Sequence, residues 1–136
     1  MANTFPIISA AKILVKSSVA LTVPEGRGVS LTGTLSPDGI PLIAAPSGAD
    51  AVIHGVTYEA DISDVNAGFI VLRGLSPIRL RIGSVGVTKG DLLRIKNNTG
   101  VWETAPAGSK NAYYEALQTV AANGICYAIP IASKSI

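Results

Sequence analysis

Turn signals recur at short intervals from Pro24 onward, and they limit the possible folds more than any other property of this sequence. Clusters of glycine, proline, asparagine and aspartate come about every 8–12 residues, in the order PEGRG, SPDG, APSGAD, VNAG, GLSP, TKGD, NNTG, PAGSK and AANG. The runs between them are short and rich in β-branched residues. Such spacing is typical of all-β folds. The sequence therefore predicts a compact β-barrel or β-sandwich of short antiparallel strands.

Two of the runs carry clear facing patterns. In IRLRI, Ile78, Leu80 and Ile82 alternate with Arg79 and Arg81, which predicts a strand with its aliphatic side chains toward the core and its arginines toward water. The run FIVLR is apolar on both faces, so it predicts a central strand that is covered on both sides.

The chain has 136 residues, which fits one domain with a distinct opening section. Residues 1–24 predict an extended N-terminal arm that leads into a first strand near Val19–Val23, and residues 25–136 predict a single β-domain. Apolar side chains on such an arm would be unfavourable in a monomer, so we expect them to pack on a neighbour. The candidate interface residues are Phe5, Ile7, Ile8, Ile13 and Leu14.

The segment from Asn111 to Gly124, NAYYEALQTVAANG, fits two structures. Its alanine, leucine, glutamate and glutamine favour a helix that ends at Gly124. The alternative is a strand YYEALQTV, a turn AANG and a last strand ICYAIPIA, which we prefer because Asn-Gly is a strong hairpin signal. Since Pro130 has no backbone N–H for a ladder, the last strand is expected at a sheet edge.

Composition narrows the class of partner. Hydrophobic residues make up 48% of the chain and charged residues only 15%, so the surface is poor in charge and self-association or a large partner is expected. The net charge of +2 is scattered, and aromatic residues are 5%. Nucleic-acid binding would need a clustered basic stripe, so no nucleic-acid partner is predicted.

One cysteine, Cys126, lies in GICYAIPIA, so no intrachain disulfide is expected and the thiol is predicted to be a small buried hydrophobe. The opening residues lack a basic region, and Lys12 and Lys16 interrupt their apolar run. We therefore expect neither a signal peptide nor a transmembrane helix, and no membrane partner. The expected setting is a reducing cytoplasm or a particle assembled there.

The stretch KGDLLRIKNNTGVWETAPAG, residues 89–108, holds the only tryptophan and predicts a structural hairpin. Gly100 is expected to take a positive φ in its turn, and Trp102 to cover cross-strand neighbours. No nucleophile, base and orienting group come together in this stretch.

Catalytic candidates are few. The single histidine, His54, is expected to share a strand face with Val52, Val56 and Tyr58 as a hydrogen-bonded structural residue. An enzyme could draw only on His54 with Glu59 and Asp61, and the EF-hand, P-loop and G-x-S-x-G patterns are absent. We therefore predict no catalytic residues, no metal site and no cofactor.

Three runs resemble small capsid decoration (cement) proteins of tailed bacteriophages: DISDVNAGFIVLRGLSPIRLRIG, VTKGDLLRIKNNTGVWETAPAG and YYEALQTVAANGICYAIPI. The family pattern has a glycine-led strand, a GD-L strand, a glycine turn, a strand and a small loop, followed by an A-L strand and a final apolar strand. The matching positions are Gly68, Gly90, Asp91, Leu92, Gly100, Gly108, Ala116 and Leu117.

The resemblance implies a trimeric β-barrel or sandwich on the outer surface of an icosahedral head, assembled in the host cytoplasm. Its partners would be the major capsid protein and two further copies of itself. Its function would be mechanical, holding capsid subunits against the pressure of packaged DNA. The alternative is a ligand- or glycan-binding β-module of a phage tail or fibre, which an exposed cluster of aromatics would favour. Those aromatics would be Tyr58, Trp102, Tyr113 and Tyr114.

Overall fold

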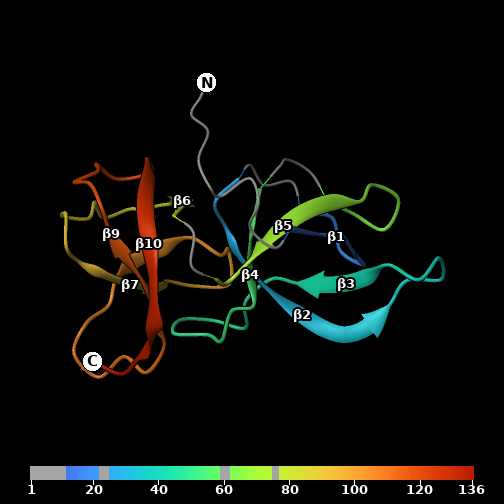
Figure 1. Cartoon of the computed structure of the whole chain (residues 1–136), viewed down its shortest axis with the longest axis horizontal. Helices are drawn as coiled ribbons and strands as arrows, with labels where there is room; N and C mark the ends of the chain where they lie inside the picture. The colour runs from blue at the N-terminus through green and yellow to red at the C-terminus, as the bar shows by residue number, and fades with distance from the viewer. Residues whose placement is uncertain (1–11, 22–24, 59–61, 75–76) are drawn as a thin grey trace.

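Ten β-strands make up the secondary structure of the computed structural model, which describes residues 12–21, 25–58, 62–74 and 77–136 (Figure 1). Within these segments no helix could span a bilayer. The predicted all-β class is confirmed. The strands are β1 (Lys12–Ser17), β2 (Gly28–Leu35), β3 (Pro41–Ala44), β4 (Gly55–Thr57), β5 (Gly68–Leu72), β6 (Ile78–Arg81), β7 (Leu92–Ile95), β8 (Trp102–Thr104), β9 (Ala112–Ala116) and β10 (Ile125–Lys134).

The first five strands form a closed barrel with the order β1-β3-β2-β4-β5. β1 closes the barrel because it pairs antiparallel with β5, with Leu14 opposite Phe69, and parallel with β3, with Lys16 opposite Leu42. The β1–β3 pair therefore departs from the antiparallel pairing that the sequence predicts. Inside the barrel, alternate side chains of its strands meet in one apolar cluster. Its buried members are Val15, Val29, Ile43, Ile62 and Ile70.

The last five strands form a second sheet with the order β6-β10-β9-β7-β8, beside the barrel (Figure 1). All of its pairings are antiparallel. Ile82, directly after β6, forms a parallel bridge with Trp102 in β8, so this sheet curls until its two outer strands approach each other.

One apolar cluster joins the barrel to the second sheet. Val56 of β4 and Val71 of β5 turn away from the barrel interior and pack in the same buried cluster as Leu80, Leu93 and Trp102 of the second sheet. All five barrel strands carry buried residues in one of the two clusters, and β5 carries them in both, with Ile70 in the barrel cluster and Val71 in the shared one. The two sheets therefore share a continuous core.

The two facing patterns are confirmed for the aliphatic side chains. Ile78, Leu80 and Ile82 are buried, and Arg79 is exposed. The expectation that Arg81 also faces water is met only in part, because Arg81 is half-buried and its Nε is buried. In β5, Ile70 points into the barrel and Val71 into the shared core, so this strand is covered on both faces at its centre.

The first strand lies earlier than the expected position near Val19–Val23. Val15 and Ser17 in β1 are buried between β3 and β5, whereas Val19 is 70% exposed in a bend. Ser17 donates its hydroxyl hydrogen to the Val19 carbonyl at 2.6 Å, which helps to turn the chain after β1. Residues 22–24 lie outside the described segments.

The hairpin interpretation of residues 111–124 is confirmed, but its first strand stops at Ala116. The chain then leaves β9, and Val120 pairs with Val87 in an isolated bridge. Asn123, with φ of +63°, turns the chain into β10.

The expectation that the last strand lies at an edge is wrong, because β10 runs between β6 and β9. The strand is long enough to change neighbours along its length. Ile125 to Ala128 pair with β6, and the pairing with β9 continues through Pro130. Pro130 therefore sits beyond the part of β10 that β6 covers, where the missing N–H costs nothing in that ladder.

Candidate functional site

The stretch at residues 89–108 is the structural hairpin that the sequence predicts. β7 and β8 pair with Ile95 opposite Trp102, and Gly100 has a φ of +81° in the turn between them. Trp102 is fully buried, and its ring meets Tyr114 edge-on with centroids 5.1 Å apart. The hairpin thus serves the core and presents no reactive group.

Gly26 is the point where the barrel, β6 and β8 are hydrogen-bonded together. Its carbonyl accepts hydrogen bonds from the indole N–H of Trp102 (3.1 Å) and the backbone N–H of Arg81 (2.9 Å). Its own N–H donates to the Thr57 carbonyl at 2.9 Å. A Cβ on Gly26 would lie 2.6 Å from the Arg81 backbone nitrogen, and φ is +93°. Only glycine fits this junction without strain.

His54 is a hydrogen-bonded structural residue, as predicted. Its Nδ1 accepts the backbone N–H of Leu31 at 3.0 Å. The expected facing is met only in part: His54 is exposed, as are Val52 and Tyr58, but Val56 is buried in the shared core together with Ile53. Alternation breaks between Ile53 and Val56, where the chain enters the short strand β4.

The described residues do not place the full catalytic alternative and form no metal-binding cluster. Glu59 and Asp61 lie outside the described residues. Among the residues that the structure describes, no three histidine, cysteine, aspartate or glutamate side chains gather as a metal site would require.

Cys126 is fully buried in the shared core, and burial raises the pKa of its thiol. Because the thiolate is the reactive form, we expect native Cys126 to react about 100-fold or more slowly with a disulfide reagent such as DTNB than the unfolded chain does. Absorbance of the released thiolate, with and without urea, measures this ratio. Equal rates in both conditions would show that the thiol is accessible.

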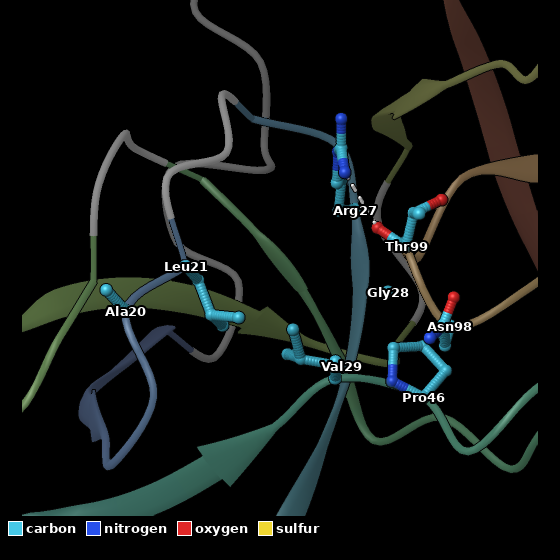
Figure 2. Close-up of a pocket in the computed structure, with 9 residues that line it drawn as sticks. Ala20, Leu21, Arg27, Gly28, Val29, Pro46, Asn98 and Thr99 are labelled. Carbon is cyan, nitrogen blue, oxygen red and sulfur yellow. Dashed lines mark hydrogen bonds between the residues drawn. The ribbon is translucent and has the colours of Figure 1, made fainter.

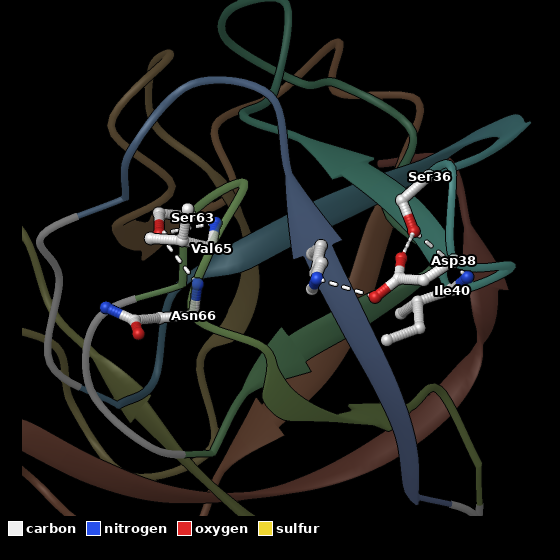
Figure 3. A network of polar contacts seen from close by, with 7 residues as sticks. Ser36, Asp38, Ile40, Ser63, Val65 and Asn66 are labelled. Carbon is white, nitrogen blue, oxygen red and sulfur yellow. Dashed lines mark hydrogen bonds and ion pairs between the residues drawn. The ribbon is translucent and has the colours of Figure 1, made fainter.

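Polar contacts fix the turn after β2 against β1 (Figure 3). Lys16 Nζ lies 2.8 Å from Asp38 Oδ2, and this hydrogen bond is the main cause that lowers the pKa of Asp38. Ser36 donates its hydroxyl to the other carboxylate oxygen of Asp38 and accepts the Ile40 N–H at 3.1 Å. Asp38 is exposed, so the role of this ion pair is to hold the loop between β2 and β3 in place and not to form a reactive centre.

Exposed apolar side chains gather on the outer face of β1 and β5. Leu14 and Phe69 lie opposite each other and are 41% and 38% exposed. Tyr58, 39% exposed, donates its backbone N–H to the Phe69 carbonyl at 3.2 Å. Lys12 Nζ lies 4.6 Å from the ring centroid of Tyr58 and 5.6 Å from that of Phe69. We call Lys12, Leu14, Tyr58 and Phe69 the outer patch.

The structure describes two of the five predicted interface residues, Ile13 and Leu14, and they face in different directions. Leu14 lies in the outer patch. Ile13, its neighbour, turns inward and packs half-buried against the barrel core. Phe5, Ile7 and Ile8 lie outside the described residues. Sequence reasoning missed Tyr58 and Phe69, because only the pairing of β5 with β1 brings them beside Leu14.

The four aromatic residues that would favour glycan binding do not form an exposed cluster. Of these four, Trp102, Tyr113 and Tyr114 are buried and Tyr58 is exposed. Burial also raises the pKa of Tyr114 well above its ordinary value. These residues therefore stabilise the core and offer no stacking surface to a sugar.

A small pocket of about 150 Å³ lies between the barrel and the β7–β8 turn (Figure 2). Leu21, Val29 and Pro46 form its apolar walls, and Arg27 and Thr99 stand at one side. Arg27 Nη1 donates to the Thr99 carbonyl at 3.0 Å. Burial lowers the pKa of Arg27, and the nearby charge of Arg81 lowers it further.

Comparison with known proteins finds similarity to solved structures. No protein-family model matches the sequence, and no curated protein matches it. The structure is similar to the crystal structure of the head fiber gp8.5 N base of bacteriophage phi29, with a TM-score of 0.67 and 13% sequence identity. The match covers 93% of this chain and 98% of that chain. At this identity the likeness establishes a shared fold.

Proposed function

We propose that the protein is a structural component of a bacteriophage virion, attached to the outside of the head. The observation that carries this proposal is the fold likeness to a head fiber base, which extends over 93% of this chain and 98% of the other. The sequence resemblance to phage decoration proteins supports the same class from turn positions and apolar alternation. The fold likeness and the sequence resemblance therefore both favour a structural protein of a phage virion.

We further propose that the chain binds several major capsid subunits at once as a homotrimer and so stabilises the shell. A surface with few charges supports this role, since permanent interfaces are more apolar than ordinary surfaces. The outer patch adds clustered apolar groups that favour contact with another chain. Symmetry then multiplies modest contacts into high avidity without a deep pocket.

The proposed role is mechanical and involves no catalysis. A glycan-binding role is the weaker candidate, because three of the four aromatics that would favour it are buried. A head that lacks the protein should bind it when it is added back, and should then withstand heating or osmotic shock better. Cosedimentation of purified protein with such heads tests the proposal. Failure to bind, with correctly folded protein, would overturn it.

We expect Leu14→Glu to weaken self-association by about tenfold or more, because it places a charge in an apolar contact. Leu14 points outward, so the fold should be preserved. Sedimentation velocity at several concentrations measures the shift from trimer to monomer. Val85→Glu is the matched control, since Val85 is 70% exposed and is not part of the outer patch. Unchanged association in Leu14→Glu would exclude the outer patch from the subunit interface.

A further inference from the structure

Two arginines start from adjoining backbone where the barrel meets β6. Arg27 follows Gly26, whose carbonyl accepts the backbone N–H of Arg81 at 2.9 Å. Both side chains are half-buried. Their charges are near enough to interact, since Arg81 lowers the pKa of Arg27 in addition to the larger effect of burial.

Neither guanidinium has all of its N–H groups hydrogen-bonded within the described part of the fold. The Nε atoms of Arg27 and Arg81 are buried without a hydrogen-bond partner, and no other side-chain nitrogen or oxygen of the described residues is in that state. Across the described segments, the pair makes one side-chain hydrogen bond, from Arg27 Nη1 to the Thr99 carbonyl. Buried polar groups of native proteins are usually paired, so two neighbouring exceptions need an explanation.

The described carboxylate closest to this pair in sequence is engaged elsewhere. Glu25, two residues before Arg27, lies 3.1 Å from Arg79 Nη2. The other ion pairs of the described residues are Lys16–Asp38 and Arg94–Glu103. Two neighbouring positive charges that no described carboxylate pairs with repel each other, and partial burial strengthens that repulsion. An anion at this place would relieve it.

We propose that Arg27 and Arg81 together form a binding site for a carboxylate. Guanidinium groups hold carboxylates through paired, charge-assisted hydrogen bonds. The pocket beside Arg27 has the apolar walls Leu21, Val29 and Pro46, which suit the aliphatic stem of an acidic side chain (Figure 2). The ligand is therefore an aspartate or glutamate side chain of a partner protein. The site does not depend on the proposed function; only the choice of a head shell protein as that partner rests on it.

Thermal unfolding with small anions tests the site itself. Glutarate, compared with sodium chloride at the same ionic strength, is expected to raise the Tm of the unmodified protein by about 3 °C. Arg27→Gln and Arg81→Gln should each lose this gain. Lys89→Gln, which removes one exposed charge elsewhere, should keep it. An equal gain in all four proteins, or none in the unmodified protein, would overturn the site.

An NMR titration tests whether Arg27 and Arg81 bind the ligand together, and a comparison with inorganic phosphate tests whether the ligand is a carboxylate. Side-chain Nε–Hε signals of Arg27 and Arg81 should shift together in an NMR titration with glutarate, while that of Arg94, already paired with Glu103 at 2.9 Å, should not. A response to inorganic phosphate without a response to glutarate would overturn the assignment to a carboxylate.

Binding to phage heads tests the partner. If the unmodified protein binds heads, Arg81→Gln should weaken binding about tenfold and Lys89→Gln should not. Equal binding by both variants would overturn the assignment of the carboxylate to the shell and leave the proposed function standing. If the unmodified protein does not bind heads, the proposed function fails, and the glutarate experiment still decides the site.

Discussion

Replacing Trp102 with alanine is expected to lower the free energy of unfolding by about 3–5 kcal/mol. The side chain is fully buried in the shared core, packs against Tyr114, and donates its indole N–H to the Gly26 carbonyl at 3.1 Å. Its removal leaves a cavity where the barrel meets the second sheet and removes a hydrogen bond that joins them. Urea unfolding followed by circular dichroism measures the loss.

Two variants separate the causes of this loss. Trp102→Phe keeps an aromatic ring but loses the indole N–H, so it should cost less than half as much as Trp102→Ala. Val85→Ala, at a position that is 70% exposed, should change the free energy of unfolding by no more than about 0.5 kcal/mol. A Trp102→Ala protein as stable as Val85→Ala would contradict the central position assigned to the indole.

Gly26→Ala is expected to destabilise the fold by about 2–5 kcal/mol. An alanine here must hold a φ of +93°, and its Cβ would meet the Arg81 backbone nitrogen at 2.6 Å. Backbone cannot move aside as a flexible side chain can, so the contact between Gly26 and β6 must open. The hydrogen bonds that the Gly26 carbonyl accepts would weaken with it. Urea unfolding of the purified variant gives the change.

Gly39→Ala is the matched control for this substitution. Gly39 has a similar φ of +83°, but a Cβ there would have no atom within 4 Å. Its cost should therefore reflect the backbone conformation alone, about 1–2 kcal/mol. The excess in Gly26→Ala measures the steric contact with β6. Equal losses in the two variants would show that β6 accommodates the methyl group freely.

Features set by neighbouring residues could be predicted from the sequence. The burial of Ile78, Leu80 and Ile82 in IRLRI depends only on strand periodicity, and the turn at Gly100 only on the conformational freedom of glycine, and the structure has both. The burial of Cys126 follows from its apolar neighbours in the same way.

Features set by distant pairings could not be predicted. Pro130 has no N–H to donate to a ladder, but whether the whole strand lies at an edge depends on where β6 ends alongside β10. The first strand was expected near Val19–Val23 because β-branched residues are dense there, whereas β3 and β5 select Lys12–Ser17 as their partner. Local propensity is a weak guide when tertiary pairing decides.

The outer patch and the proposed carboxylate site also combine residues that the local sequence indicates with residues that only distant strand pairing brings together. Leu14 was predicted as an interface residue from its place in an apolar run, and the structure leaves it exposed in the outer patch. Its companions Tyr58 and Phe69 join it only through strand pairing. Arg27 and Arg81 lie far apart in sequence, and only the bond to the Gly26 carbonyl brings them together. Locally, Arg27 is marked only by its place within the glycine-rich turn PEGRG.

The chain order of the strands has a consequence during synthesis. All five barrel strands, which end at Leu72, emerge from the ribosome before β6 to β10 do. During that interval the outward-facing side chains of Val56 and Val71 have no cover, and the carbonyl of Gly26 has no indole to bind. One side of the barrel is then open to water and to other nascent chains until β6 to β10 emerge and cover it.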